Sequence, residues 1–198
     1  MTISEGRMGD RRVQRTRDLL LDALVSLLKE RGYEKLTVQN LIERAGVGRA
    51  TFYAHFQSKD ELLSCSLERL RSHLTGRRAS APAARGRPPD RLGFALPFFE
   101  HIDSHRRIYH ATIGRESEWT VEQKMQRLLR DLAREDLERG TRSSAAALDL
   151  AVRYVVGTIW ALVVWWMESR NPLSAEEVNR LFQQMTDPAL DAIFRIGP

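Results

Sequence analysis

The sequence predicts an all-α protein made of two helical units. Apolar residues recur three and four positions apart in several stretches, and no stretch shows the period-two alternation of a half-buried strand. Ser, Thr or Gly stands at the ends of these stretches, where helix caps are favoured. The chain has 198 residues, of which 42% are apolar and 29% charged, so it is large enough to bury a core and has a globular composition.

Three helices are predicted in the first part of the chain. Residues 16–31 carry leucine and alanine pairs four positions apart, and Gly32 follows where a left-handed C-terminal cap is favoured. Thr37 is placed to cap a second short helix, which Gly46 ends. A third short helix is expected over residues 49–55.

A fourth helix and a connection follow. Ser58 and Glu61 form a capping box, so a helix is expected to start near Lys59 and to run to about Leu74. Residues 75–90 lose the periodicity and gather Gly, Ala, Ser, Pro and Arg. This composition predicts a flexible connection between the two units.

The second unit is also read as helices. Residues 92–101 are apolar and aromatic, and residues 119–139 trace an amphipathic stripe that a glycine stops. Ser143 or Ser144 is placed to cap a long helix that reaches about residue 170.

A final helix is expected after a second capping box. Ser174 and Glu177 form this box. Asp187 and Pro188 are expected to break or kink the helix before Arg195, because proline lacks the backbone N–H and clashes with the preceding turn.

Residues 154–167 are the most apolar run in the chain. The run is shorter than the roughly 20 residues that cross a bilayer, so no membrane segment is predicted. A helix that is apolar on all sides must bury all sides, and the second unit is small. One face is therefore expected to meet a second copy in a symmetric dimer, with enclosure inside a monomer as the alternative.

The positive charge is concentrated in the first unit. Residues 1–78 hold 15 Lys and Arg against 10 Asp and Glu, whereas residues 79–198 hold 16 of each kind. A basic segment of this kind favours binding to a polyanion such as DNA, although an ordinary basic surface would look the same. The single cysteine, Cys65, excludes an intramolecular disulfide, and the N-terminus lacks an apolar signal segment, so the cytoplasm is the expected compartment.

The second and third helices have the spacing of a helix-turn-helix. At about 100° per residue, Phe52 and Phe56 share the inward face of the third helix. The outward face is small and hydrogen-bonding and carries Ala50, Thr51, Tyr53 and Ala54. Arg49 lies nearer the core-facing side of the helix, but its long side chain can turn outward. There its guanidinium could donate two hydrogen bonds to guanine O6 and N7. The alternative is a solvated helix face with an incidental tyrosine.

These residues resemble the DNA-binding signature of the tetracycline-repressor (TetR) family. The segments T-V-x-x-L-I, A-G-V, T-F-Y-x-H-F and S-K-x-E-L stand in register across residues 37–62, and R-G-Y precedes them. One departure is Gly48, where the family usually has a serine cap, at a cost of a few tenths of a kcal/mol. The resemblance implies a DNA-binding domain over residues 14–74, with the helix-turn-helix at 37–56, and a ligand-binding and dimerisation domain over 88–198.

The resemblance also implies a set of DNA contacts. Arg49, Ala50 and Thr51 would face base edges in the major groove, with Gln39 near the groove. Contacts to the DNA backbone would come from Thr37, Tyr53, His55 and Lys59. Two copies on a palindromic operator would supply the discrimination that one copy lacks. Five arginines near the N-terminus would form either an arm that reaches DNA or a solvated disordered tail; they are Arg7, Arg11, Arg12, Arg15 and Arg17.

Family members pair through their last two helices and commonly hold a small ligand in the C-terminal half. Aromatic residues that would line such a cavity, or else form plain core, are Phe94, Phe98, Phe99, Tyr109, Trp119 and Trp160. The expected function is therefore that of a homodimeric, ligand-responsive transcriptional repressor without a cofactor. Ligand and DNA would antagonise each other because the ligand favours a conformation that binds the operator poorly.

Three other functions are compatible with the sequence. A transcriptional activator would show the same residues, and a helical adaptor would lack salt-dependent affinity for DNA. An enzyme could use a metal site at His101, His105 and His110, but no HExxH motif, phosphate loop or nucleophile elbow accompanies them. A redox role for Cys65 competes with simple packing.

Overall fold

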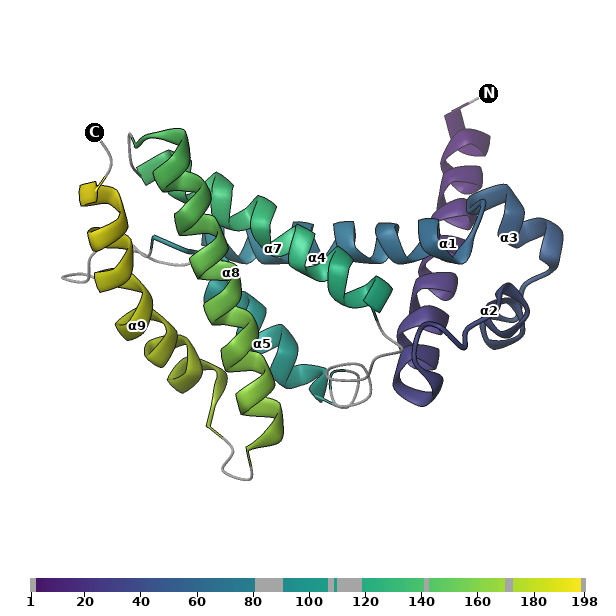
Figure 1. The fold of residues 1–198 in the computed structure, drawn as a ribbon. Helices are drawn as coiled ribbons and strands as arrows, with labels where there is room; N and C mark the ends of the chain where they lie inside the picture. Colours follow the sequence, from purple (N-terminus) through teal and green to yellow (C-terminus); the bar gives the residue numbers. More distant parts are fainter. Residues whose placement is uncertain are drawn as a thin grey trace. The chain divides into compact units, whose positions relative to one another are not determined.

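The computed structural model describes residues 3–80, 91–106, 109, 119–140, 143–169 and 173–196, and every regular element among them is a helix. This confirms the all-α prediction. By packing, the chain divides near Arg69 into two compact units. The first unit holds α1, α2, α3 and the start of α4, together with residues 119–122 of α7. The second holds the rest of α4 and α7, with α5, α8 and α9 (Figure 1). The limits 14–74 and 88–198 remain a prediction.

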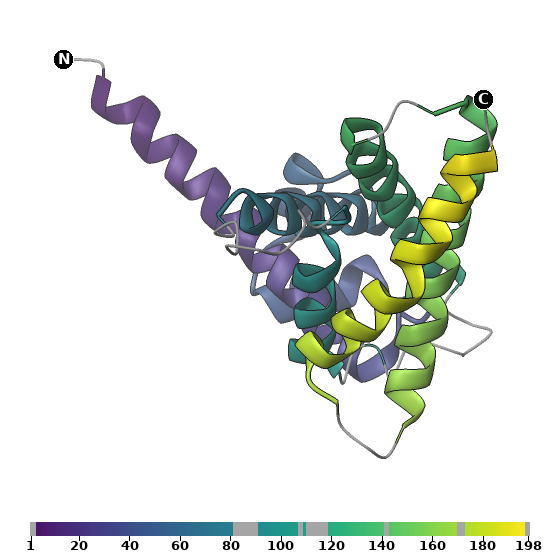
Figure 2. The ribbon, with the colours of Figure 1, turned by 90° about the vertical axis from the view of Figure 1, so that its left-hand side faces the viewer.

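The first helix is longer than the sequence pattern predicted. α1 runs over Ile3–Arg31 as one continuous helix, which Figure 2 shows in purple. Its apolar stripe is confirmed, because Leu20, Leu24 and Leu27 are buried, and Gly32 ends it with a φ of 73°. The prediction of a start near residue 16 followed the apolar stripe alone. No proline precedes residue 82, and arginine and glutamine are good helix formers, so nothing stops the helix at the edge of the stripe.

The next three helices begin where their caps predict. α2 spans Val38–Ala45, α3 spans Arg49–His55 and α4 spans Lys59–Ser80. At the start of α4, the Ser58 hydroxyl accepts a hydrogen bond from the Glu61 backbone N–H at 3.2 Å. α4 continues beyond the predicted end at Leu74, so the flexible connection does not begin at residue 75 as expected. The rest of that connection, residues 81–90, lies outside the described residues.

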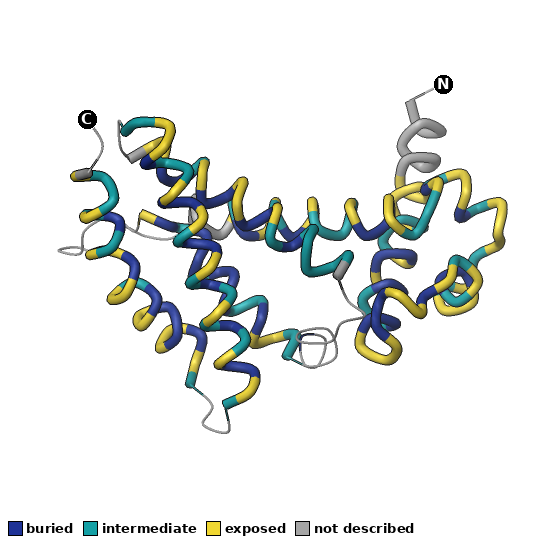
Figure 3. The backbone as a smooth tube through the Cα atoms, in the orientation of Figure 1, coloured by how far each residue is buried: buried dark blue, intermediate teal, exposed yellow. Residues whose placement is uncertain are grey.

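The second unit packs α5, α8 and α9 together. α5 spans Ala95–Ser104, α7 spans Trp119–Gly140, α8 spans Ala145–Glu168 and α9 spans Ala175–Ile196. α9 contacts both α5 and α8, and α8 and α9 lie side by side in Figures 1 and 2. Figure 3 shows buried residues, in dark blue, along the sides of α8 and α9 that face each other.

Both predicted caps of the last two helices are present. Ser144, rather than Ser143, caps α8 by accepting from the Ala147 N–H at 3.2 Å. Ser174 and Glu177 form the reciprocal box that starts α9, with bonds of 2.7 and 3.2 Å.

The prediction that Asp187 and Pro188 break the last helix is wrong. α9 continues through this residue to Ile196. Proline removes one backbone hydrogen bond, but Thr186 and Leu190 on either side of it are fully buried. Tertiary packing therefore holds the helix on both sides of the proline.

α8 is longer than the apolar run that predicts it. With 24 residues it is long and apolar enough to cross a bilayer by those two criteria, so the length argument made for residues 154–167 does not hold for the whole helix. A core helix passes the same test, and 44% of its most apolar window is buried inside the structure.

Candidate nucleic-acid interface

The helix-turn-helix is held against α1 by an ion pair as well as by its apolar core. Arg44 on α2 forms a two-pronged bond with Glu30 on α1, with distances of 2.7 and 2.8 Å, and also donates to the Ser26 hydroxyl. The Arg44 guanidinium lowers the pKa of the Glu30 carboxyl, chiefly through this hydrogen bond. A planar guanidinium that meets both carboxylate oxygens fixes orientation as well as distance. The contact therefore orients α2 on α1.

The ends of α2 are closed by local hydrogen bonds. The Thr37 hydroxyl accepts from the Asn40 N–H and the Asn40 side chain accepts from the Thr37 N–H, both at 3.2 Å. At the other end Gly46 adopts a φ of 64°, in the left-handed region, and its N–H bonds to the carbonyls of Ile42 and Glu43. This conformation turns the chain sharply, and it favours glycine because a Cβ is disfavoured there. The caps thus set the direction in which α3 leaves.

α3 presents the two faces that its sequence predicts. Phe52 and Phe56 are 0% and 1% exposed, whereas Tyr53 is 48% exposed. Arg49, Ala50 and Ala54 are also exposed, and Thr51 is half-buried. α3 therefore carries an outward surface of small, polar and cationic side chains on a rigid aromatic base. Such a surface is suited to hydrogen bonding with base edges and phosphates in a major groove.

The expected DNA-contacting residues occupy different local environments. The Arg49 guanidinium lies 5.9 Å from the Tyr53 ring centroid, one helical turn away, so Arg49 is on the outward side. Gln39 is exposed and donates to Glu43 at 2.7 Å, and His55 is half-buried beside Phe56. Gln39 thus lies on α2, and Arg49 and His55 lie on α3.

Lys59 is held more tightly than the sequence suggests. Its ammonium donates to the Tyr33 carbonyl at 3.2 Å and lies 4.4 Å from the Tyr33 ring centroid. Tyr33 in turn donates to Asp60, and burial together with this bond raises the tyrosine pKa. Two of the three ammonium protons remain for other partners.

The arginines on α1 do not form a single arm. Arg17 lies 5.1 Å from the Phe56 ring centroid and donates to the Cys65 sulfur at 3.4 Å, so it belongs to the packed unit. Arg11, Arg12 and Arg15 are exposed on the helix, which rules out a disordered tail for these positions. The side chain of Arg7 lies outside the described residues.

Two protein families match the two parts of the chain. Bacterial regulatory proteins of the tetR family match residues 20–64, which include α2, α3 and their turn. A family described as transcriptional regulator C-terminal region matches residues 92–188. The chain belongs to the TetR family.

The relatives of this TetR-family protein are transcriptional regulators. The HTH-type transcriptional repressor KstR2 of Mycolicibacterium smegmatis is 27% identical over 178 residues, which cover 84% of this chain and 86% of the relative. KstR2 of Mycobacterium tuberculosis is 28% identical over 181 residues, which cover 86% and 90%.

Solved structures show the same fold. The TetR transcriptional regulator from Streptococcus agalactiae superposes with a TM-score of 0.65 at 24% identity, covering 91% of this chain and 98% of that one. NalD of Pseudomonas aeruginosa, described as the secondary repressor of the MexAB-OprM multidrug efflux pump, superposes with a TM-score of 0.61 at 19% identity, covering 89% and 96%.

The C-terminal unit of this TetR-family protein contains an aromatic cluster. The expected pocket residues Phe94, Phe98 and Phe99 are completely buried, Tyr109 is 6% exposed, and Trp160 is half-buried. Trp119 begins α7, and its side chain lies outside the described residues.

Two further aromatic residues join the cluster and were missed from the sequence. The ring of Phe99 lies 6.2 Å from that of Trp166 and 5.8 Å from that of Phe182, both edge-on. Trp166 lies inside the most apolar run of the chain, where periodicity does not define an inner face. The structure assigns Phe99, Trp166 and Phe182 to the contact among α5, α8 and α9.

His101 on α5 and His105, which caps its C-terminus, lie side by side. The rings of His101 and His105 lie 4.3 Å apart, and burial together with the charges of His105 and His73 lowers the pKa of His101 to about 4. No group of three candidate metal ligands occurs among the described side chains, and His110 lies outside them.

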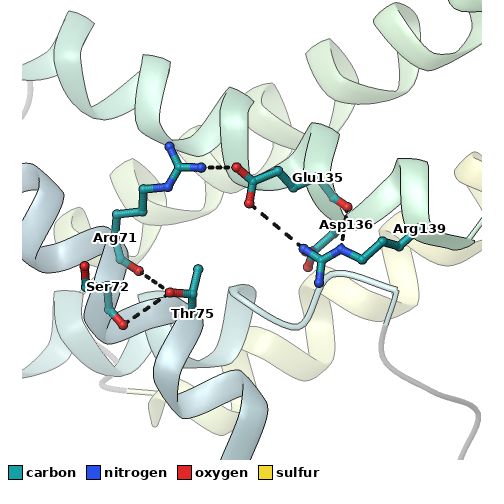
Figure 4. Close-up of polar contacts among 6 residues, drawn as sticks. All are labelled: Arg71, Ser72, Thr75, Glu135, Asp136 and Arg139. Carbon is teal, nitrogen blue, oxygen red and sulfur yellow. Dashed lines mark hydrogen bonds and ion pairs between the residues drawn. The ribbon is translucent and has the colours of Figure 1, made fainter.

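A polar network connects α4 to α7 within the C-terminal unit (Figure 4). Arg71 pairs with Glu135, and Arg139 lies 4.0 Å from the same carboxylate and 3.2 Å from that of buried Asp136. The Thr75 hydroxyl donates to the Arg71 carbonyl at 3.0 Å. The network anchors the second half of α4 to α7.

Proposed function

We propose that this protein is a homodimeric repressor that binds a palindromic operator and is released from it by a small-molecule effector. The observation that carries the proposal is the outward face of α3, with Arg49 and Tyr53 exposed on a base made by buried Phe52 and Phe56. The bacterial cytoplasm, where the operator lies, is the expected location.

The expected DNA contacts divide into base readout and positioning. Arg49, Ala50 and Thr51 approach base edges, with Gln39 near the groove. Thr37, Tyr53, His55 and Lys59 contact phosphates, which fix register without reading sequence. Thr37 can keep its capping role while doing so, because its oxygen accepts from Asn40 and its hydroxyl proton remains to be donated.

The proposed dimer interface lies on the uncovered faces of α8 and α9. Leu150 and Trp165 on α8 are 53% and 47% exposed, and Met185 on α9 is 51% exposed. Gly157 and Ala161 lie between the two α8 residues on the same exposed face, and a Cβ added at Gly157 would meet nothing within 4 Å. Small residues at the centre and large apolar residues toward the ends suit close helix packing across a two-fold axis.

Repression is favoured over activation by the relatives. The KstR2 proteins are repressors and cover most of their own length in the match. The fold alone does not decide the sign, because the solved neighbours include the dihydroxyacetone kinase operon activator DhaS, with a TM-score of 0.56, as well as the repressor NalD.

The DNA-binding proposal is tested with duplexes selected from a random pool by the full-length protein. Arg49→Ala is expected to weaken binding to the selected duplex by about 10-fold to 100-fold, since a bidentate base contact is worth about 1–3 kcal/mol. Its matched control is Arg130→Ala, which removes the charge of another exposed arginine, on α7. Gel-shift titration measures both affinities.

The outcomes distinguish recognition of the base sequence from a general effect of positive charge on DNA binding. A selected consensus that is palindromic, with binding lost only in Arg49→Ala, supports the proposal. Equal losses in both variants would indicate a general charge effect, and no enrichment of any duplex would overturn the DNA-binding function.

A further inference from the structure

A segment of α1 near the N-terminus stands free of the packed first unit. Residues 11–15, called the free segment below, are all exposed, and five consecutive residues cover more than one full turn of a helix. Among the described side chains, the buried stripe of α1 begins only at Leu20. Figure 2 shows the start of α1, in purple, extending beyond the other helices of the first unit. The free segment is therefore not held by a hydrophobic core.

The free segment begins beside the end of α3. Arg17 lies two residues beyond it, with its guanidinium 5.1 Å from the ring centroid of Phe56, the residue that caps the C-terminus of α3. Arg17 also donates to the Cys65 sulfur of α4 at 3.4 Å, which fixes this part of α1. The major groove proposed to hold α3 is about 12 Å wide and is bordered by phosphates. A helix that starts at the end of α3 therefore starts close to these phosphates.

Three exposed arginines share one side of the free segment. At about 100° per residue, Arg11, Arg12 and Arg15 fall within about 100° of the helix circumference. Like charges three and four positions apart destabilise a helix in water. Charge repulsion and the missing core thus both act against this helix in the free protein. An anionic partner would remove the repulsion.

The neighbouring acidic residues do not neutralise these arginines. In the sequence, no Asp or Glu stands three or four positions from Arg11 or Arg12. Asp18 stands three positions from Arg15, but its carboxylate pairs with Arg69 of α4 at 3.2 Å. The positive side of the free segment therefore remains open to an anion from outside the chain.

We propose that Arg11, Arg12 and Arg15 bind operator phosphates beside the groove that α3 enters, and that the free segment becomes fixed when they do. A guanidinium can bond two phosphate oxygens at once, and such contacts fix register without reading bases. The surface continues the candidate nucleic-acid interface, because Arg17 at its base contacts the end of α3. This inference rests on the proposed DNA-binding function and adds a contact region outside the helix-turn-helix.

The salt dependence of DNA binding tests the proposal, with the full-length protein and the duplex selected from the random pool. Each phosphate contact contributes about 0.9 to the slope of log affinity against log salt concentration. Arg12→Gln combined with Arg15→Gln is expected to flatten this slope by about 1.8 and to leave the selected sequence unchanged. Glutamine is a good helix former and both positions are exposed, so the melting temperature is expected to stay the same.

The matched control replaces two arginines of α7 in the same way. Arg127 and Arg130 are also exposed and three positions apart, so Arg127→Gln combined with Arg130→Gln removes the same charge. The control is expected to keep the wild-type slope. Equal flattening in both variants would show a general charge effect and overturn the proposal, and so would an unchanged slope in the α1 variant. A different selected sequence for the α1 variant would also overturn it, because the arginines would then read bases.

Amide hydrogen exchange gives a second measurement that is local to α1. Peptides that contain residues 11–15 are expected to exchange rapidly in the DNA-free protein, because no core protects this part of the helix. The selected duplex is expected to slow their exchange in the wild type and in the α7 control. Equal slowing in the α1 variant would show that its arginines do not hold the free segment on DNA, and would overturn the proposal.

The outcomes keep this inference separate from the proposed function. An enriched duplex that the wild type and the α1 variant bind with the same salt slope would overturn the inference and leave the operator-binding function standing. If no duplex is enriched, the same slopes are measured on the unselected pool. A flatter slope there for the α1 variant alone would support the phosphate contacts while the sequence-specific function fell, and equal slopes would overturn both.

Discussion

The helix-turn-helix and the α8–α9 pair differ in what each leaves uncovered. Around α2 the polar groups at the helix ends are bonded locally, by Thr37 with Asn40 and by Gly46, and the uncovered surface of α3 is polar and cationic. Along α8 and α9 the uncovered surface is apolar, with Trp165 and Met185 about half-exposed. A polar surface on a rigid scaffold suits a charged, hydrated partner such as DNA. An apolar surface of this kind indicates a partner that removes it from water.

The largest expected effect comes from charging the apolar surface. Leu181→Lys on α9 is expected to convert the dimer to a monomer, because burial of a large apolar side chain is worth about 1.5–3 kcal/mol and a two-fold interface counts it twice. The matched control is Leu19→Lys on α1, where a leucine is 41% exposed compared with 36% for Leu181. Light scattering at micromolar concentration measures the mass. A wild-type monomer, or equal losses of mass in both variants, would contradict the assignment of this face.

The same contrast explains which features the sequence could predict. The helix-turn-helix depends on neighbours in the chain: Thr37 and Gly46 act within one helical turn, and α2 and α3 were predicted to the residue. The second unit depends on contacts distant in sequence. In the run at residues 154–167, Trp160 is half-buried, Trp165 is exposed and Trp166 is buried, and an apolar pattern on all sides cannot distinguish them.

Helix ends were predicted less well where no cap marks them. α1 begins earlier and α4 ends later than their apolar stripes, because a helix continues until a breaker or a competing contact stops it. The break expected at Pro188 fails for the opposite reason, since buried neighbours on both sides outweigh one lost hydrogen bond.

A smaller effect is expected from His101, the half-buried histidine of α5. The folded-state pKa of His101 is about 4, below its ordinary value of 6.5, so the unfolded chain binds more protons between these values. The contribution of His101 to the free energy of unfolding is therefore fully present above about pH 6.5 and is lost as the pH falls toward 4. Between pH 7 and pH 5 this loss is about 1–2 kcal/mol, once the partial exposure of the side chain is allowed for.

Urea unfolding of the wild type and of His101→Gln at pH 7 and pH 5 measures this loss. The difference between the two pH values is expected to shrink in the variant, whatever the variant's stability at pH 7. An unchanged pH dependence would show that His101 is readily protonated in the folded protein.

The smallest effects are expected at two glycines of the recognition turn, which sharpen the view of this region as a rigid scaffold. Gly46 has a φ of 64° and Gly48 a φ of −78°, and a Cβ on either meets nothing closer than 3.8 Å. Gly46→Ala is therefore expected to destabilise the fold by about 1 kcal/mol through backbone strain alone. Gly48→Ser is expected to stabilise it by a few tenths of a kcal/mol, because the serine can cap α3, which now has no side-chain cap. Chemical denaturation measures both changes, and opposite signs at positions two residues apart would show that backbone conformation, rather than space, restricts the turn.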